Sequence, residues 1–449
     1  MQSKSFSLKV NHAIKPYNKS IKVDSDKSIS IRSFLIASIS QNVSIAQNIL
    51  ESEDVFSTIS CLKKLGVQIK KNGPKSYIIS GKGLGSLFAR KNLKLNFGNS
   101  GTLARLLIGI LSTTPFVEIK VQGDKSLNKR NMKKLIKLMS EFGAEFFPKK
   151  KFNFPLKLIS TEMPIGINYN AGISAQLKSA VILAGLNSYG TTKILEEKES
   201  RNHTENMLIK NPQVIKLKKS KKKLIEIFGK KYLKPINIRV PGDPSSAAFF
   251  AALTILNKNS NLKIKNVGLN QTRIGFYELL KKHGAKIKFK NIKKNNNEVV
   301  GDIFVRSSKL KPIKANAKYY PSTTDEYVIL SVCAAMISGI SVFKGIAGLS
   351  NKESSRAYEM KKILNQIGVK CNVTRNEMRI YGPKKIKSKN KIIKVGKLND
   401  HRICMATVCL SLTTGTKCNI KNFETVDTSS PSFLKIIKSI GGKFEIQKN

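Results

Sequence analysis

The 449-residue chain has no tryptophan, only four histidines and no apolar run long enough to span a membrane. Its cysteines include no Cys-x-x-Cys pair, and its histidines lack the spacing of metal ligands. These absences disfavour a disulfide framework, a metal centre and a membrane protein, and they indicate no resident cofactor. The N-terminus has no apolar signal core, so we expect a cytoplasmic protein whose thiols are buried and reduced.

Acidic residues are also scarce, with 28 Asp and Glu against 81 Lys and Arg, so the formal net charge is +53. Such a charge could attract nucleic acid. The excess is nearly all lysine spread along the chain, however, without the interleaved aromatic residues on which bases stack. We interpret it as solvated surface, including the dense runs 216–223 and 286–294. A lysine-rich nucleic-acid-binding protein remains the alternative from another functional class.

Six apolar, Ala/Leu-rich stretches each open with small, polar or charged residues. The openings are 25–32, 99–105, 174–178, 243–248, 325–326 and 400–402. A helix N-terminus presents unpaired N–H groups and partial positive charge, and it therefore favours anions. Several such ends with added Lys and Arg predict binding of a heavily anionic small molecule.

The openings belong to a repeated pattern of strand, apolar helix, strand, amphipathic helix and strand, which recurs about every 70 residues. Five of the amphipathic segments end in glycine, which suits a helix C-terminus with positive φ. The apolar helices should be buried and the amphipathic ones half exposed. A break at 230–240 leaves three repeats on each side, which predicts two similar lobes with a ligand between them.

Each opening can also be explained by an ordinary structural role, such as a helix cap or a turn, without any function. Ser28 and Arg32 share one helix face with Lys27 at its start, yet an N-cap with solvated charges would look the same. Gly101 would let a ligand approach backbone N–H groups, although such a glycine more often marks a turn. Ser174 and its neighbours suit phosphate oxygens but also a simple cap.

The later openings divide in the same way. Lys352, Glu353 and Arg356 could form an ordinary surface ion pair, which contributes little stability. Asp325 argues against this, because it opens a helix too apolar to be exposed, and a buried carboxylate usually needs a partner or a purpose. The opening at 241–246 has no Lys or Arg, so we expect a structural cap there.

Together these segments resemble the enolpyruvyl transferase family of 3-phosphoshikimate 1-carboxyvinyltransferases. The strings that carry the resemblance are DKSISIR (26–32), GNSGTLAR (98–105), SAQLKSAVILAGL (174–186), SRNHTENML (200–208), VPGDPSSAAF (240–249), DEY (325–327), KESSR (352–356) and DHR (400–402). They follow the family order over nearly the whole chain, and they are specific jointly rather than singly.

The resemblance implies an α/β fold, a two-lobed inside-out α/β barrel with six βαβαββ-type repeats, three per lobe. The first lobe would comprise 22–239 and the second 1–21 with 240–449. It further implies a monomer that uses no cofactor or metal. The substrates would be phosphoenolpyruvate and shikimate 3-phosphate, with enolpyruvyl transfer to the 5-hydroxyl and release of phosphate.

The family pattern assigns roles to individual residues here. Shikimate 3-phosphate would be bound by Lys27, Ser28, Arg32, Ser174, Ala175, Gln176, Arg201, Asp325 and Lys352. Phosphoenolpyruvate would be held by Lys27, Gly101, Arg130, Gln176, Arg356 and Arg402. Proton transfer would fall to Asp325 as the base at the 5-hydroxyl, Glu353 as donor to the methylene, and Lys27, with the division among the three left open.

Some positions depart from the family. Ser126 stands where other members have Arg, which is why we select Arg130, and Leu106 replaces a common Pro. Several strings resemble the branch that often tolerates glyphosate, a mimic of phosphoenolpyruvate. That branch has Ala where this chain has Gly101, so we expect glyphosate to compete with phosphoenolpyruvate.

The nearest rival is the sister enzyme that transfers enolpyruvyl to UDP-N-acetylglucosamine. That enzyme carries a reactive cysteine on a loop of the first lobe. The only cysteine in 22–239 is Cys61, which lies within an amphipathic helical pattern, so the rival is disfavoured.

Overall fold

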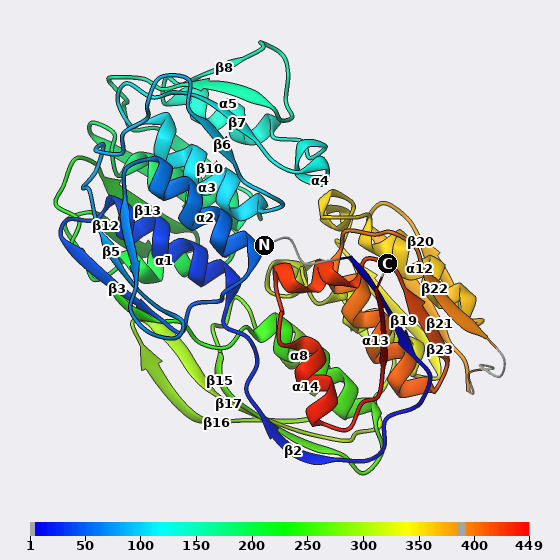
Figure 1. The fold of residues 1–449 in the computed structure, drawn as a ribbon. Helices are drawn as coiled ribbons and strands as arrows, with labels where there is room; N and C mark the ends of the chain where they lie inside the picture. The colour runs from blue at the N-terminus through cyan, green and yellow to red at the C-terminus, as the bar shows by residue number, and fades with distance from the viewer. Residues whose placement is uncertain (1–4, 385, 387–390, 449) are drawn as a thin grey trace. The chain divides into compact units, whose positions relative to one another are not determined.

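The computed structural model describes residues 5–384, 386 and 391–448. Helices and strands alternate along the chain (Figure 1), and the strands of the described residues form six sheets of four strands each. The chain divides into two compact units: unit 1 is Met1–Asp24, Pro241–Lys293 and Val299–Asn449, and unit 2 is Ser25–Val240 and Lys294–Glu298. This division and the expected lobes differ at residues 22–24, 240 and 294–298. The lobe boundaries given above, 22–239 and 1–21 with 240–449, therefore stay a prediction.

All six sheets share one topology. An edge strand pairs in parallel with its neighbour, and that neighbour pairs antiparallel with the third strand. In unit 2 the strands in spatial order are β14 (Asn237–Arg239), β3 (Val43–Gln47), β5 (Ser76–Ser80) and β4 (Gln68–Lys71); β6 (Lys94–Asn96), β7 (Glu118–Gln122), β9 (Leu156–Ile159) and β8 (Glu145–Phe147); and β10 (Asn168–Ala171), β11 (Thr191–Glu196), β13 (Lys223–Phe228) and β12 (Ile215–Lys219).

Unit 1 repeats this arrangement. Its strands in spatial order are β16 (Lys286–Asn295), β17 (Glu298–Arg306), β15 (Asn261–Gly268) and β2 (Asn18–Ile21); β18 (Lys314–Ala315), β19 (Gly339–Lys344), β21 (Glu377–Gly382) and β20 (Lys370–Val373); and β22 (Ile392–Val395), β23 (Lys417–Ile420), β1 (Phe6–Val10) and β24 (Glu445–Lys448). The turn between β16 and β17, at Lys294–Glu298, groups with unit 2.

Two helices accompany each sheet. The first of each pair is α1 (Lys27–Ile39), α3 (Gly101–Ser112), α6 (Ala175–Gly185), α8 (Pro244–Leu256), α11 (Tyr327–Ala335) or α13 (His401–Thr414). The second is α2 (Glu53–Lys64), α5 (Lys133–Glu141), α7 (His203–Leu208), α9 (Gly275–Lys282), α12 (Arg356–Gln366) or α14 (Phe433–Ser439). Short helical turns lie at α4 (Lys125–Asn128), α10 (Tyr320–Thr323), η1 (Ala317–Tyr319), η2 (Ala347–Asn351) and η3 (Phe423–Thr428).

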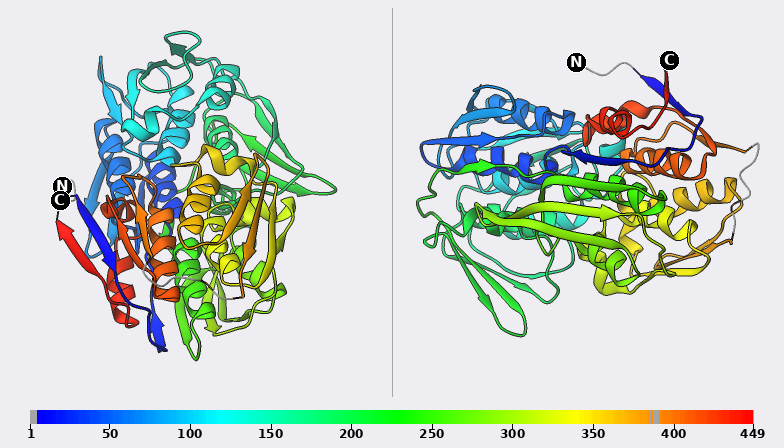
Figure 2. Two further views of the ribbon diagram at one scale, coloured as in Figure 1. Left: turned by 90° about the vertical axis from the view of Figure 1, so that its right-hand side faces the viewer. Right: turned by 90° about the horizontal axis from the view of Figure 1, so that it is seen from below.

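The expected βαβαββ repeat is therefore confirmed, and the fold is the predicted α/β architecture. Two repeats exchange their first strands: β2, which leads into α1, pairs with β15, whereas β14, which leads into α8, pairs with β3. In the last sheet the N-terminal strand β1 pairs with both β23 and β24, and Figure 2 shows β1 and β24 side by side. These pairings join segments that are far apart in the sequence.

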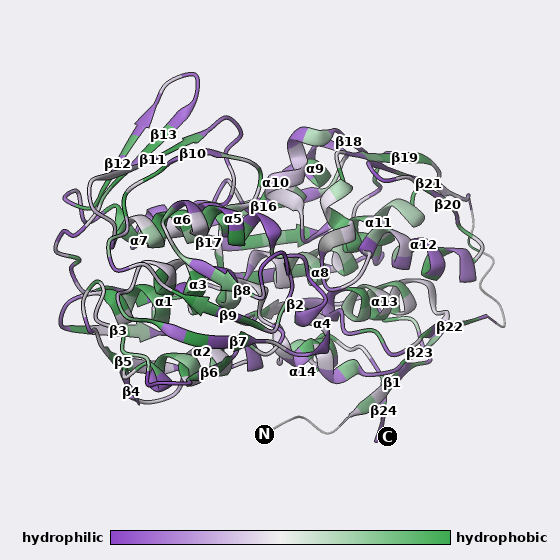
Figure 3. Cartoon of the chain, turned by 90° about the horizontal axis from the view of Figure 1, so that it is seen from above, coloured by the Kyte–Doolittle hydropathy of each residue, from purple (hydrophilic) through white to green (hydrophobic). Residues whose placement is uncertain are grey.

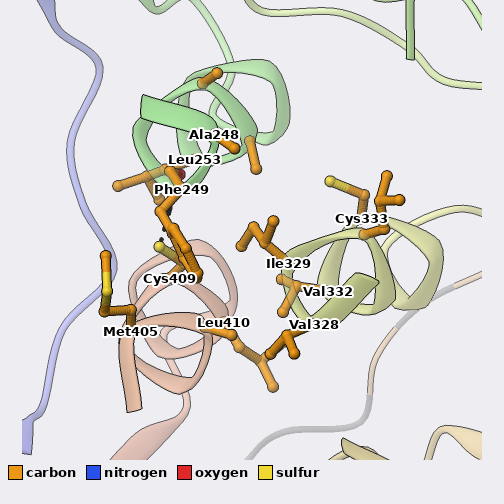
Figure 4. Packing of buried hydrophobic residues seen from close by; sticks show 14 of the residues in the cluster. Ala248, Phe249, Leu253, Val328, Ile329, Val332, Cys333, Met405, Cys409 and Leu410 are labelled. Atoms are coloured by element: carbon orange, nitrogen blue, oxygen red, sulfur yellow. Dashed lines mark hydrogen bonds between the residues drawn. The ribbon is translucent and has the colours of Figure 1, made fainter. Parts of the chain in front are cut away.

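The apolar helices form the centre of each unit, as expected. In α3 every residue except Arg105 is buried, and in α8 every residue except Leu256. Within unit 1, α8, α11 and α13 turn side chains such as Phe249, Ile329 and Leu410 toward one another (Figure 4). Burying a side chain of this size stabilises the folded state by roughly 1.5–3 kcal/mol, so these helices need no polar face.

The amphipathic helices end as predicted. The glycines that follow five of them all have positive φ: Gly66, Gly143, Gly284, Gly368 and Gly441. The third repeat lacks this glycine, and its helix α7 is only six residues long.

The lysine-rich runs lie on the surface. Residues 216–223 extend over β12 and its turn to β13, where the end of the hairpin is hydrophilic (Figure 3), and residues 286–294 lie within β16. The lysines of both runs are exposed except Lys223, whose side chain is 12% exposed. In the part of the chain that the structure describes, no helix combines the length and apolarity needed to cross a membrane.

All six cysteines are buried and unpaired with one another, namely Cys61, Cys333, Cys371, Cys404, Cys409 and Cys418. Burial raises the pKa of every one of these thiols, to about 12 for Cys61 and Cys333. Since the thiolate is the reactive form, the thiols should be inert in the folded protein.

We expect iodoacetamide at pH 8 to modify none of the six thiols in the native protein and all of them after unfolding in guanidinium. A raised pKa means that the thiolate fraction at pH 8 is far below that of a free cysteine, and burial removes access as well. Mass spectrometry of the treated protein measures the number of adducts. Stoichiometric labelling of any one cysteine in the native state would contradict this expectation.

Candidate active site

Five of the six predicted openings are helix N-termini whose cap side chain accepts a backbone N–H. The cap residues are Asp26, Ser100, Ser174, Asp243 and Asp400. At the sixth opening the helix begins at Tyr327, and Glu326 occupies the cap position without a side-chain bond to the backbone. Capping by these side chains satisfies single N–H groups and leaves others of the first turn available.

Lys27 opens α1 and forms an ion pair in unit 2. Its Nζ lies 2.9 Å from Oδ2 of Asp54, in the first turn of α2, and the two side chains are 15% and 7% exposed. The carboxylate therefore holds the ammonium in place while part of it stays accessible. Asp54 has no counterpart among the residues selected from the sequence.

Arg32, one turn further along α1, is buried. Its Nε donates to Thr204 Oγ1 (2.9 Å), its Nη2 to Ser179 Oγ (3.0 Å) and its Nη1 to the Ser28 carbonyl (3.1 Å). The guanidinium thus ties α1 to α6 and to α7. A substrate contact for Arg32 or Ser28 remains a prediction.

The start of α3 is joined to the start of α6 by Arg105. Its Nη1 donates to the Gly101 carbonyl and to Gln176 Oε1, both at 2.9 Å. Gln176 Nε2 in turn donates to Thr102 Oγ1 at 2.9 Å. The side chain of Gln176 is therefore fixed against the glycine-containing opening, with Ser174 and Ala175 directly before it. Arg105 was not among the predicted site residues.

Arg130 reaches the same opening from the segment after α4. Its Nη2 donates to Asn99 Oδ1 and, at 3.4 Å, to Ser126 Oγ, while Asn99 Nδ2 donates to Asp124 Oδ2 at 2.7 Å. A Cβ atom at Gly101 would lie 3.0 Å from Arg130 Nη1 and 2.7 Å from Arg105 Nη1. The glycine thus keeps two guanidinium groups close to a helix N-terminus, an arrangement suited to an anion.

In unit 1 the predicted residues gather around Arg356. Its Nε donates to Asp400 Oδ2 (3.0 Å), its Nη2 to Glu353 Oε2 (2.5 Å) and its Nη1 to Asp325 Oδ1 (3.2 Å). The side chain is only 1% exposed. Burial alone would lower the pKa of Arg356, but the surrounding carboxylates outweigh it and raise the pKa above its ordinary value.

Asp325 also faces two further cations. Its Oδ1 lies 3.5 Å from Lys352 Nζ and 3.8 Å from Arg402 Nε. Lys352, Glu353 and Asp325 keep 27%, 19% and 14% of their side chains exposed, whereas Arg356 and Asp400 are sealed. The cluster thus leaves two carboxylates and an ammonium partly exposed, while the buried Arg356 bonds to both carboxylates.

The opening at 241–246 differs from the expectation in one respect. Asp243 caps α8, as predicted, by accepting the Ser245 N–H at 2.8 Å. It also accepts from Arg273 Nη2 at 3.0 Å, and both residues are buried. The cation comes from the loop after β15, so the local sequence could not reveal it.

Three residues that received no role from the sequence join the candidate site in the structure: Asp54, Arg105 and Asp400. Arg105 and Asp400 belong to segments singled out in the sequence, and the position of Asp400 before a buried helix was a usable signal. Nothing in local spacing links Asp54 to Lys27 or Arg105 to Gln176. Among residues 5–384, 386 and 391–448, no cluster of three or more His, Cys, Asp or Glu could hold a metal ion.

Comparison with known proteins gives a consistent result. The family model described as EPSP synthase (3-phosphoshikimate 1-carboxyvinyltransferase) matches residues 12–437. The chain is 34% identical to the 3-phosphoshikimate 1-carboxyvinyltransferase of Paramagnetospirillum magneticum, over 95% of this chain and 96% of that protein. With the Bacillus subtilis protein of the same name the identity is 35%, over 94% and 97%.

Solved structures agree with this. An EPSP synthase from Acinetobacter baumannii superposes with a TM-score of 0.83 at 32% identity, covering 98% of this chain and all of that one. The enolpyruvyl transferase NikO from Streptomyces tendae has a TM-score of 0.78 at 12% identity, with both chains fully covered, and therefore supports the fold alone.

Proposed function

The chain belongs to the EPSP synthase (3-phosphoshikimate 1-carboxyvinyltransferase) family, and from that premise we propose how its residues divide the reaction. It transfers the enolpyruvyl group of phosphoenolpyruvate to the 5-hydroxyl of shikimate 3-phosphate and releases phosphate, in the shikimate pathway to aromatic amino acids. The substrates carry two phosphates and two carboxylates, so binding requires converging cations and helix N-termini.

Unit 2 would supply most of the substrate contacts. Shikimate 3-phosphate would be bound there by Lys27, Ser28, Arg32, Ser174, Ala175, Gln176 and Arg201. Phosphoenolpyruvate would be bound by Lys27, Gly101, Arg130 and Gln176. The supporting observations are that Arg105 donates to both the Gly101 carbonyl and Gln176, which joins the N-termini of α3 and α6, and that the Arg130 guanidinium lies close to Gly101.

Unit 1 would supply the proton transfers, and its carboxylate cluster is the observation that carries the proposal. Asp325, beside Lys352, takes the proton of the 5-hydroxyl while the hydroxyl oxygen forms a bond to C2 of phosphoenolpyruvate. Glu353 gives a proton to the methylene, which becomes a methyl group. The tetrahedral adduct then loses phosphate as the methyl returns a proton. Arg402 would hold phosphoenolpyruvate. Arg356 would do the same only by exchanging some of its bonds to Asp325 and Glu353 for bonds to that substrate, because all three of its nitrogens now donate to carboxylates.

The direct test is phosphate release, measured with both substrates and with each omitted in turn. Release that requires both phosphoenolpyruvate and shikimate 3-phosphate is the expected result. Equal release when UDP-N-acetylglucosamine replaces shikimate 3-phosphate would favour the sister enzyme. That outcome is not expected, because Cys61 is buried in α2, where its thiol donates to the Asn96 carbonyl, and burial raises its pKa to about 12.

We further propose that the protein acts as a monomer in the cytoplasm and binds no nucleic acid. The lysines of the two dense runs lie on strands and turns, and all of them except Lys223 are exposed, which supports a solvated surface. Salt-dependent retention on DNA without release of phosphate from the two substrates would contradict this proposal. Size-exclusion chromatography with light scattering measures the mass of the species in solution.

Gly101→Ala is expected to raise the KM for phosphoenolpyruvate and to weaken inhibition by glyphosate, each by about tenfold or more. The added methyl would meet Arg105 Nη1 at 2.7 Å and Arg130 Nη1 at 3.0 Å, so the guanidinium groups must shift. Steady-state kinetics at varied phosphoenolpyruvate and glyphosate measures both effects. Gly172→Ala is the control, because a Cβ there would meet nothing within 4 Å. Unchanged glyphosate inhibition in Gly101→Ala would remove Gly101 from this role.

A further inference from the structure

Lys178, in the second turn of α6, carries an ammonium group that the reaction does not use. Its side chain is 0% exposed, and Nζ lies 2.9 Å from Glu196 Oε1 and 2.7 Å from Glu205 Oε1. Both carboxylates are also 0% exposed. Glu196 ends β11 and Glu205 lies in α7, so one ammonium joins three elements of unit 2.

The segment between those two carboxylates contains Arg201. Directly before it, Ser200 is fixed on three sides: its N–H and its hydroxyl donate to Glu196 Oε1 at 2.8 and 2.7 Å, and its carbonyl accepts from Lys178 Nζ at 3.4 Å. The base of the Arg201 loop is therefore held by Lys178 both directly and through Glu196.

The same helix turn also orients a second arginine. Ser179, next to Lys178, accepts from Arg32 Nη2 at 3.0 Å, and Thr204, next to Glu205, donates to Ser179 Oγ at 2.8 Å and accepts from Arg32 Nε. The ion pairs of Lys178 with Glu196 and Glu205 thus hold α7 against α6, and Arg32 bonds to both of these helices.

A fully buried lysine is an energetically unfavourable choice where only packing is needed. Desolvating an ammonium and two carboxylates costs several kcal/mol per ion, and well-packed apolar side chains often give equal or greater stability. What the ionic network provides is a defined geometry: three elements meet at one ammonium, and the loop between two of them has a single anchored conformation at Ser200.

We propose that Lys178 is a positioning residue for shikimate 3-phosphate, acting through Arg201. This inference rests on the proposed function, in which Arg201 contacts that substrate. The neighbouring Lys223 provides a natural contrast. Its Nζ lies 3.1 Å from Glu199, 3.7 Å from Glu205 and 3.9 Å from Glu196, and no contact joins it to Ser200 in the part of the chain that the structure describes.

The test compares Lys178→Met with Lys223→Met by calorimetric titration of shikimate 3-phosphate. Methionine keeps most of the length of lysine and removes the charge. We expect Lys178→Met to weaken binding 10- to 100-fold, mainly as a higher KM for shikimate 3-phosphate, with kcat and the KM for phosphoenolpyruvate changed less than threefold. Lys223→Met should change the affinity less than threefold. Wild-type affinity in folded Lys178→Met would overturn the inference.

A double-mutant cycle with Arg201→Ala separates positioning from general destabilisation. If Lys178 acts through Arg201, adding Lys178→Met to Arg201→Ala should weaken binding much less than Lys178→Met does in the wild type, because Arg201 is gone and only the indirect support of Arg32 is left to lose. An equal loss in both backgrounds would overturn the inference. If Arg201→Ala alone binds shikimate 3-phosphate as the wild type does, the assignment of Arg201 fails, which is a failure of the proposed function.

Lys178→Met leaves two buried carboxylates without their cation, and the variant could fail to fold for that reason. Lys178→Met with Glu196→Gln and Glu205→Gln removes all three charges and keeps similar shapes. This triple variant should fold and still bind shikimate 3-phosphate at least tenfold more weakly than the wild type. Wild-type affinity in the triple variant would overturn the proposal.

Discussion

Replacing Asp325 with alanine is expected to lower turnover by a factor of about 10²–10⁴ while the protein still folds. The carboxylate lies beside Lys352 and is 14% exposed, and its replacement removes the group proposed as the base at the 5-hydroxyl. The fold should persist, because Arg356 still donates to Asp400 and Glu353. Phosphate release under saturating substrates gives kcat, and circular dichroism with thermal unfolding checks the fold.

Asp302→Ala is the matched control for this experiment. Asp302 is an ion-paired aspartate of the same unit, 13% exposed against 14% for Asp325, and its Oδ2 lies 3.1 Å from Lys263 Nζ. It has no place in the proposed reaction, so its variant should keep kcat within about twofold of the wild type. Near-normal turnover in Asp325→Ala would remove this residue from the mechanism.

Arg356→Met is expected to destabilise unit 1 by about 3–5 kcal/mol and to abolish most activity. The guanidinium is sealed from solvent and neutralises carboxylates on three different segments, those of Asp325, Glu353 and Asp400. Removing it leaves negative charges close together with one of them fully buried. The melting temperature should fall by about 10 °C, as scanning calorimetry measures.

Arg379→Met provides the contrast. Arg379 also donates to a carboxylate, at 2.5 Å from Glu377 Oε1, but it is half exposed on β21. Water screens such a pair, so the melting temperature should not change measurably. If the two variants had the same melting temperature, the carboxylates around Arg356 would not need its charge for stability, and the account of the unit 1 cluster would be wrong.

The repeats could be predicted because each one uses a strong local signal. Helices that are apolar on every side, such as α8, must be buried, and glycines such as Gly66 mark the ends of the half-exposed helices. Both signals depend on residues within a few positions of each other. The family motifs added the order of the repeats and named the candidate site residues, whose roles stay predictions.

Local signals did not predict the strand exchanges or the ion-pair partners, although the lobes that the family resemblance implies, 22–239 and 1–21 with 240–449, already place β2 with β15 and β14 with β3. The pairing of β2 with β15 and of β14 with β3 is invisible to periodicity, because either strand would suit either sheet. Likewise, the partners of Lys27 and Asp243 are Asp54 and Arg273, which lie on other elements. Only the folded arrangement decides which of many charged residues meet.

The pairing of β1 has a consequence for the order of events during synthesis. Leu8 pairs with Ile420 and Phe6 with Lys448, so β1, which is made before the other described strands, joins a sheet that is complete only when β24 has been made. At about 5–20 residues per second, the N-terminal strand waits on the order of tens of seconds for its partners. The three sheets of unit 2, by contrast, have all their strands once β14 has been made. Ribosome-bound chains should therefore complete these sheets first, while β1 remains an unpaired strand that the cell must keep from aggregating.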